Sequence, residues 1–263
     1  MISKNQIKFV RQLEQKKFRK AENLFIAETH KVVGDLLAAG FRPKHIFATN
    51  EWVSEHRSIL STIGCPITEV SLDELTRLSL QQHPQQVLAL FPIPDANPTS
   101  SISHQTSSIS HQTSSLSLLL DNVQDPGNLG TIIRIADWFG IDTIYCSPGT
   151  VDAWNPKVVQ ATMGSIARVH IIYIEPDELF SQLPADYPIY GTFLDGDNIY
   201  TQQLTSHGLI VMGNEGNGIS DAVRARVSQK LLIPDFHNGD TADSLNVAIA
   251  TAITCSEFRR RSL

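Results

Sequence analysis

The sequence predicts an α/β protein, with a small N-terminal α/β module followed by a larger domain built on a mostly parallel sheet. Two observations support this fold class. Short apolar runs alternate with helical or turn-rich segments on both sides of a polar repeat, which is typical of strands connected by helices. The chain has 263 residues, 41% of them hydrophobic, enough for a substantial core in one large domain or two modest ones.

The N-terminal module is predicted to contain short strands around an amphipathic helix. Leu24 to Ala27 and His45 to Ala48 are predicted strands, and Lys31 to Ala39 between them has the spacing of a helix that ends at Gly40. Val87 to Phe91 is predicted to be a further strand.

A polar repeat marks the boundary between the two domains. Residues 101–107 (Ser-Ile-Ser-His-Gln-Thr-Ser) are followed by the same seven residues at 108–114. Such side chains compete with the backbone for hydrogen bonds and offer little apolar surface for a core. We therefore expect a linker over residues 96–115, a first domain over 1–95 and a second over 116–263.

The second domain contains six predicted strands, each an apolar run. They lie at 116–121, 143–146, 168–174, 188–194, 208–213 and 230–234. In a parallel sheet covered by helices, ligands bind at the carboxyl ends of the strands. A functional site is therefore expected in the loops that follow these runs.

Charge is unevenly distributed along the chain. The formal net charge is −6, yet the first 31 residues carry eight basic and three acidic side chains. Such a basic arm can bind a polyanion locally, because charges beyond a Debye length are screened; a solvated helix face is the alternative. No apolar run is long enough for a membrane span or a secretory signal, so a cytoplasmic protein is expected.

The cysteine and histidine residues give no sign of a metal site. Cys65, Cys146 and Cys255 are odd in number and widely separated, and each lies in an apolar pattern. This favours reduced packing residues over a disulfide framework or a zinc cluster. His104 and His111 lie in the polar repeat, where a fixed ligand geometry is not expected.

The first of three strand-to-loop junctions runs from Leu118 to Arg134. A buried strand ends in a polar turn, and from Leu129 the apolar positions follow one helix face up to Gly140. Asn128 then lies at the helix N-terminus. Because six residues rotate by about 240° around a helix, Arg134 serves the same site only if it points along the sheet edge. A buried Arg134 needs a phosphate or a carboxylate, from a ligand or from a structural acid.

The second junction places one carboxylate, Glu215, in a turn that contains Gly213, Gly216 and Gly218. Glycine lets the backbone approach a ligand closely. The spacing matches neither a phosphate-binding loop nor the dinucleotide fingerprint. A plain strand-to-helix turn, with Ser220 capping the next helix, is the alternative.

The third junction follows the predicted strand from Leu231 to Pro234. A polar loop leads to Ser244 and Asn246, which open a helix that is apolar nearly all round. Such a helix is expected to be buried, either within the domain or against another subunit. The two polar residues can cap it, and capping is compatible with a site because helix N-termini also bind polar ligands.

These three segments, in this order, resemble the signature motifs of the SpoU family of ribose methyltransferases in the SPOUT superfamily. The matching residues are Asn128 with Arg134, then Gly213-Asn-Glu-Gly216-Asn-Gly218, then Ile233-Pro234 with Ser244-Leu-Asn246. The resemblance spans residues 116–260. Two features depart from the family pattern: Asp243 stands where glutamate is frequent, and the loop from Phe236 to Thr241 is unusually polar.

A looser resemblance covers the N-terminal module. Leu24-Phe-Ile-Ala-Glu28 and Pro84-Gln-Gln-Val-Leu-Ala89 are similar to the RNA substrate-binding domain that is joined to many of these enzymes.

The resemblance implies a fold, a cofactor and an assembly. The second domain is expected to contain the SPOUT-type trefoil knot, to bind S-adenosylmethionine in the knotted loops, and to form a homodimer without a metal ion. The implied catalytic residues are Asn128, Arg134, Glu215, Ser244 and Asn246. The implied cofactor-binding residues are Thr192, Leu194, Met212, Gly213, Gly216, Ile233 and Leu245. RNA-contacting residues are expected in the basic N-terminal arm: Lys16, Lys17, Arg19, Lys20 and Lys31.

The implied reaction is methyl transfer from S-adenosylmethionine to a ribose 2′-hydroxyl of RNA, with ribosomal RNA favoured by the added N-terminal module. A ribose hydroxyl is a poor nucleophile, so it must be deprotonated and aligned. Arg134 is expected to activate it while contacting the adjacent phosphate, although an arginine is normally protonated. The alternatives are transfer RNA as substrate and a noncatalytic RNA-binding assembly factor; a nucleotide-binding oxidoreductase is disfavoured because its fingerprint is missing.

Overall fold

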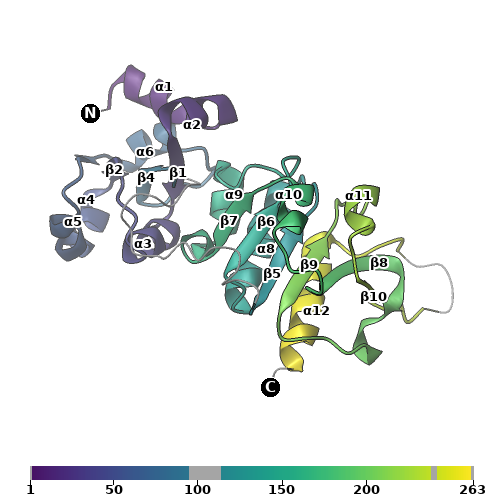
Figure 1. Cartoon of the computed structure of the whole chain (residues 1–263). Helices are drawn as coiled ribbons and strands as arrows, with labels where there is room; N and C mark the ends of the chain where they lie inside the picture. Colours follow the sequence, from purple (N-terminus) through teal and green to yellow (C-terminus); the bar gives the residue numbers. More distant parts are fainter. Residues whose placement is uncertain (1, 95–113, 238–241, 262–263) are drawn as a thin grey trace. The chain divides into compact units, whose positions relative to one another are not determined.

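The computed structural model describes residues 2–94, 114–237 and 242–261, which form two compact units (Figure 1). One unit falls in Met1–Asp95 and Asp152–Arg168, and the other falls in Ala96–Val151 and Val169–Leu263. Most of the predicted linker, with His104 and His111, lies outside the described residues.

The first unit is built on a four-stranded sheet in the order β1-β4-β2-β3. Its strands are β1 (Leu24–Glu28), β2 (His45–Ala48), β3 (Ile67–Glu69) and β4 (Val87–Pro92). β4 is antiparallel to β1 and β2, whereas β2 and β3 are parallel. The three predicted strands of this module are confirmed, and β3 is an addition.

Short helices cover this sheet. They are α1 (Lys4–Gln12), α2 (Lys16–Glu22), α3 (His30–Ala38), α4 (Asn50–Glu55), α5 (Arg57–Ile63), α6 (Leu72–Leu78) and α9 (Pro156–Ala161). α3 confirms the predicted helix, and the basic arm of residues 1–31 forms α1, α2, the strand β1 and the start of α3. Ser3 and Gln6 begin α1 with a capping box, in which each side chain accepts a backbone N–H of the other residue.

Helix α9 comes from the middle of the predicted second domain but packs in the first unit. It contacts β1, and the ring of Trp154, just before it, lies 4.5 Å from the ring of Phe25, centroid to centroid. Val158 and Val159 on α9 are buried. The first unit therefore includes a segment that is distant in sequence.

The second unit is built on a six-stranded parallel sheet in the order β10-β8-β9-β5-β6-β7. Its strands are β5 (Leu116–Leu120), β6 (Thr143–Cys146), β7 (His170–Tyr173), β8 (Ile189–Asn198), β9 (Gly208–Met212) and β10 (Gln229–Leu232). All six predicted strands are confirmed, together with the parallel sheet. In this order β8 and β9 lie between β10 and β5. Because all strands are parallel, the loops that follow β5, β8, β9 and β10 lie at the same end of the sheet although they are distant in sequence.

The helices of the second unit are α8 (Pro126–Trp138), α10 (Pro176–Ser181), α11 (Asp221–Arg224) and α12 (Val247–Arg260). Asp125 begins α8 by accepting the backbone N–H of Asn128. α8 and α12 pack together and run parallel, because Asn246 meets Asn128 near their starts and Arg259 donates to the Phe139 carbonyl near their ends. No helix in the described part of the chain is both long and apolar enough for a membrane span.

Helix α12 is less buried than its composition predicts. Val247, Thr251, Cys255 and Phe258 are buried, whereas Ile249 is 52% exposed. Burial within the domain therefore accounts for only part of its apolar surface. The three cysteines are free, as expected, and burial raises the pKa of the Cys255 thiol to about 12.

Candidate active site at the strand ends of the parallel sheet

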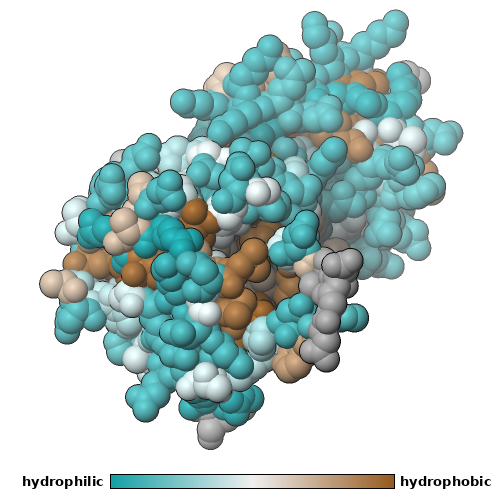
Figure 2. All heavy atoms as spheres, turned by 90° about the vertical axis from the view of Figure 1, so that its right-hand side faces the viewer, coloured by the Kyte–Doolittle hydropathy of each residue, from teal (hydrophilic) through white to brown (hydrophobic). Residues whose placement is uncertain are grey.

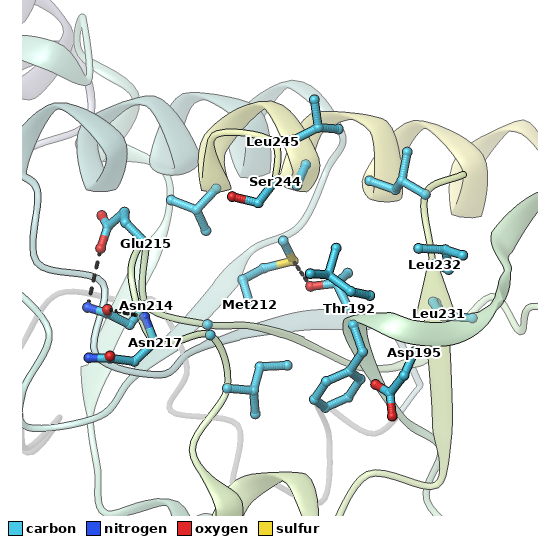
Figure 3. A pocket seen from close by; sticks show the side chains of 18 of the residues that line it. Thr192, Asp195, Met212, Asn214, Glu215, Asn217, Leu231, Leu232, Ser244 and Leu245 are labelled. Carbon is cyan, nitrogen blue, oxygen red and sulfur yellow. Dashed lines mark hydrogen bonds between the residues drawn. The ribbon is translucent and has the colours of Figure 1, made fainter. Parts of the chain in front are cut away.

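A cavity of about 500 Å³ lies at the carboxyl ends of the strands in the second unit (Figure 3). Its lining comes from residues 192–195 of β8, 212–219 at and after the end of β9, 231–233 at the end of β10, and 243–245, 247 and 250 around the start of α12. Figure 3 shows Glu215 and Asp195 at opposite ends, with Met212 between them. On the side where β8 and β10 lie, hydrophobic residues gather in and around a hollow in the surface (Figure 2).

One wall of the cavity results from a local departure of β8 from the sheet. Gly191 pairs with Lys230 and Asp197 pairs with Leu231, so residues 192–196 leave the regular ladder between these two pairs. A Cβ on Gly196 would lie 2.6 Å from the backbone carbonyl carbon of Leu231, so only glycine lets the strands rejoin there. This excursion presents Thr192 and its neighbours to the cavity.

A closed glycine-rich turn forms another wall. Asn214 and Gly218 exchange two backbone hydrogen bonds of 2.9 Å, and the Asn214 side chain accepts the N–H groups of Gly216 and Asn217. A Cβ on Gly213 would lie 2.3 Å from the carbonyl carbon of Gly218. The turn therefore requires glycine at 213 because its own backbone approaches closely.

The carboxylate of Glu215 accepts hydrogen bonds from two neighbouring segments. Its donors are the Asn128 side-chain amide at 3.0 Å, the backbone N–H groups of Asp125 and Gln124 at 3.2 and 3.3 Å, and the Asn214 amide at 3.4 Å. Partial burial raises the pKa of Glu215, but these hydrogen bonds outweigh it and hold the pKa below its ordinary value. Glu215 is therefore an ionised acceptor that ties the glycine-rich turn to the start of α8.

Asn128 links Glu215 to the third junction. Its amide nitrogen donates to Glu215, and its amide oxygen accepts from the Asn246 amide at 2.9 Å. Asn246 in turn caps α12, because its side-chain oxygen accepts the backbone N–H groups of Ala248 and Ile249. Both ends of each amide are used, so the three junctions are joined by one oriented chain of hydrogen bonds.

Sequence reasoning missed a buried layer beneath this chain. Asp121, only 2% exposed, accepts the backbone N–H of Ser220 at 2.8 Å and the side-chain amide of Asn122. Asn122 has a left-handed φ of 60°, and its carbonyl accepts the Asn214 amide at 2.7 Å. The available signal was the polar pair that follows the apolar run 116–120, because buried polar groups at a strand end must find partners.

The predicted cofactor-binding residues all line the cavity: Thr192, Leu194, Met212, Gly213, Gly216, Ile233 and Leu245. Of the predicted catalytic residues, Glu215 and Ser244 line it, and Asn128 and Asn246 join its walls. The structure thus brings together four of the five catalytic predictions; their roles stay predictions.

Arg134 lies apart from this group. It is exposed on α8 and makes no hydrogen bond or ion pair within the described residues. A structural acid therefore does not account for it there. Six residues beyond Asn128 along the helix, it lies about 9 Å further on and faces a different direction.

The predicted RNA-contacting set in the first unit needs one correction. Arg19 is 2% exposed, and its guanidinium pairs with Asp152 and donates to the carbonyls of Leu13 and Glu14. Its prediction as an RNA contact is therefore wrong, because every polar edge of the side chain is used inside the unit.

The other basic residues in that set remain accessible. Lys16, Lys17 and Lys20 are exposed on α2. Lys31 is half exposed and pairs with Asp35 at 2.8 Å. Among the residues that the structure describes, the accessible and unpaired charge of this set is therefore concentrated on α2.

The sequence matches two family models. The model of the SpoU rRNA methylase family covers residues 115–256, and the model of the MRM3-like substrate binding domain covers residues 4–89. The first match contains all three strand-end junctions.

Individual relatives agree with these matches. The chain is 32% identical to the 23S rRNA (guanosine(2553)-2′-O)-methyltransferase RlmP of Bacillus subtilis, over 98% of this chain and 97% of the relative. A solved structure of an rRNA methyltransferase from Sinorhizobium meliloti with bound AdoMet is 29% identical, with a TM-score of 0.84 over 100% of this chain and 97% of the other. A putative TrmH-family RNA methyltransferase from Porphyromonas gingivalis is 38% identical, with a TM-score of 0.80 over 99% of both chains.

Proposed function

Because this chain belongs to the SpoU rRNA methylase family, we propose that it methylates a ribose 2′-hydroxyl of ribosomal RNA at the strand-end cavity of its second unit. The protein is an RNA 2′-O-methyltransferase and its cofactor is S-adenosylmethionine. The observation that carries the proposed site is the chain Glu215–Asn128–Asn246, which joins the three motif loops around one cavity.

The cavity fits the cofactor in size and chemistry. Small-molecule sites have volumes of about 300–1,000 Å³ and mostly apolar walls with a few polar groups. Met212, Ile233 and Leu245 supply apolar walls, and Gly213 leaves room for the backbone to come close. When bound, S-adenosylmethionine supplies a methyl group that its sulfonium has already activated.

The protein residues align the reactants. Glu215, Asn128 and Asn246 hold the loops that contact the cofactor, and Ser244 faces the same cavity. Arg134 contacts the RNA phosphate next to the target nucleotide and stabilises the negative charge that develops on the 2′-oxygen as it attacks the methyl group and its proton passes to solvent water. A guanidinium suits this role because it stays charged and offers five N–H donors.

We propose that the enzyme is a homodimer through α8 and α12. Trp138 on α8 is 85% exposed, and Ile249 on the neighbouring α12 is also exposed. Exposed apolar residues on two packed helices suit an interface between copies. The same arrangement brings Arg134, which is exposed on α8 and is not among the residues that line its own cavity, to the cavity of the partner.

A mixing experiment tests this arrangement. Arg134→Ala and Asn246→Ala enzymes are each expected to be inactive, and heterodimers formed from them should regain activity because one site contains both residues. No recovery on mixing, with heterodimers demonstrated, would show that Arg134 acts within its own chain. A monomer by light scattering would refute the dimer.

We assign substrate binding to residues 1–95 and methyl transfer to residues 116–263, with residues 152–168 packed in the first unit. Lys16, Lys17 and Lys20 are the proposed phosphate contacts. The trefoil knot stays a prediction from the family resemblance, and so does the cytoplasmic location, where ribosomal RNA is the available substrate.

Mapping of 2′-O-methylated positions tests the function. Total RNA from cells without the gene should lack 2′-O-methylation at one position in ribosomal RNA. Purified enzyme with labelled S-adenosylmethionine should methylate that position in RNA from these cells. If the missing 2′-O-methylation lay in transfer RNA instead, transfer RNA would be the substrate. RNA binding without cofactor binding in calorimetry would instead favour the noncatalytic alternative.

A further inference from the structure

Three carboxylates line the cavity, and they differ in how they are paired. Asp195 pairs with Arg224 and, at 3.3 Å, with Lys230. Glu215 accepts four N–H groups. Asp243 is exposed and has no hydrogen bond or ion pair with any residue that the structure describes. Asp243 is therefore the cavity carboxylate whose charge is least compensated.

The cavity as a whole is negative. Its described lining contains these three carboxylates and one guanidinium, Arg224, which gives a formal charge of −2. Cation pairing at Asp195 and N–H donors at Glu215 reduce the potential at the two ends.

Asp243 lines the cavity and directly precedes Ser244, which Figure 3 shows above Met212, between Glu215 and Asp195. The sulfonium of S-adenosylmethionine also lies in the middle of its molecule, between the adenosine and amino-acid parts. In a cofactor that spans the cavity, the sulfonium would therefore lie in the part lined by Ser244 and Asp243.

We propose that Asp243 makes the enzyme discriminate between S-adenosylmethionine and its product S-adenosylhomocysteine by charge. The inference rests on the proposed cofactor site. The cofactor has a positively charged sulfur, and the product has a neutral thioether of almost the same shape. The α-ammonium group is common to both molecules, so only the Coulomb attraction between Asp243 and the sulfonium distinguishes them, and methyl transfer abolishes it. Asp243 thereby favours cofactor binding and product release.

Calorimetry with the full-length enzyme tests the proposal. Asp243→Asn should weaken binding of S-adenosylmethionine by about fivefold, the size of one screened ion pair near a surface, and leave S-adenosylhomocysteine binding unchanged. Sinefungin, which carries an amine in place of the methylsulfonium, should lose affinity as the cofactor does. Asp243→Glu should behave like the wild type, and the wild-type preference should decrease with added salt.

Asp195→Asn/Arg224→Gln is the matched control. It removes one carboxylate and its paired guanidinium from the same cavity and leaves the net charge unchanged, so it should change both affinities by the same factor. The proposal would be overturned if Asp243→Asn bound both molecules as tightly as the wild type does, or if it lost affinity for both by the same factor.

A cavity-filling variant separates this proposal from the site assignment. Ala250 lines the cavity from α12, and Ala250→Phe adds a ring to it. If folded Ala250→Phe enzyme, checked by circular dichroism, binds S-adenosylmethionine normally, the site assignment itself fails. If it loses binding while Asp243→Asn keeps the wild-type ratio, only the charge proposal fails.

Discussion

Arg19 in the first unit and Arg134 in the second differ in almost every physical respect. Arg19 lies in a segment rich in basic residues, yet it is buried and paired with Asp152. Arg134 lies on a helix whose other faces pack into a core, yet it is exposed and unpaired within the described residues. Local composition alone would predict an exposed Arg19 and a buried, paired Arg134. What a charged residue can do depends on its partners, which residues distant in sequence supply.

The largest expected effect separates the two arginines by activity. Arg134→Ala should lower methyl transfer by about 100-fold or more, the size seen when one transition-state donor is removed. Its stability and its affinity for S-adenosylmethionine should change little, because the side chain is exposed. Labelled-methyl transfer to ribosomal RNA and calorimetry measure both. Arg134→Lys, which keeps the charge without the planar fork, should be intermediate, and wild-type turnover in Arg134→Ala would refute the assignment.

Arg19 should affect stability instead of chemistry. Arg19→Met leaves Asp152 unpaired and should lower the free energy of unfolding by about 3–5 kcal/mol, measured by urea denaturation. In Arg19→Met/Asp152→Leu the loss should be smaller, because no uncompensated charge remains. An unchanged urea midpoint in Arg19→Met would show that the pair does not hold the first unit together.

The accessible lysines of α2 should affect RNA affinity through salt dependence. Replacing Lys16, Lys17 and Lys20 with glutamine should reduce the slope of log affinity against log salt by about 2–3, if each contacts one phosphate. Fluorescence anisotropy with ribosomal RNA fragments measures this slope. Lys31→Gln is the control, since Lys31 is already paired with Asp35 and should have a smaller effect. Equal slopes for the triple variant and the wild type would show that these lysines do not contact the RNA phosphates.

The smallest effect concerns a paired acid of the second unit. Hydrogen bonds from Arg260, and then from Arg261, hold the pKa of Glu257 to about 2, below its ordinary value of 4.5. The stabilisation is therefore present above pH 4.5 and is lost as the pH falls from 4.5 towards 2. Glu257→Gln should remove this part of the acid dependence of the melting temperature. Identical acid profiles would show that the cluster adds nothing.

The sequence predicted the central strands of the parallel sheet well because they are buried on both faces. Buried strands such as β5 and β9 are continuous apolar runs, which a single sequence displays directly. β3 has only three residues, none of them fully buried, so its pattern is too short to recognise. The position of α9 was also unpredictable, because its contact with β1 depends on tertiary structure alone.

The candidate site was predictable as a set of loops but not as a network. Strand ends and glycine spacing identified Glu215 and Asn128, and the family resemblance assigned their roles. The hydrogen bonds from Gln124 and Asp125 to Glu215 join residues about ninety positions apart in the chain, as their numbering shows. Arg19 failed for a similar reason, since its partner Asp152 lies in another predicted domain.

The placement of residues 152–168 has a practical consequence for dissecting the protein. The chain connects the two units at 151–152 and at 168–169 as well as through 96–113. Cleavage within 96–113 would leave residues 1–95 attached to the rest only by noncovalent contacts, among them the packing of α9 against β1. A fragment that begins at residue 114 would carry Trp154, Val158 and Val159 without the strand β1 that they pack against, and the bared surface would favour aggregation. The catalytic half is therefore best expressed together with its N-terminal neighbour.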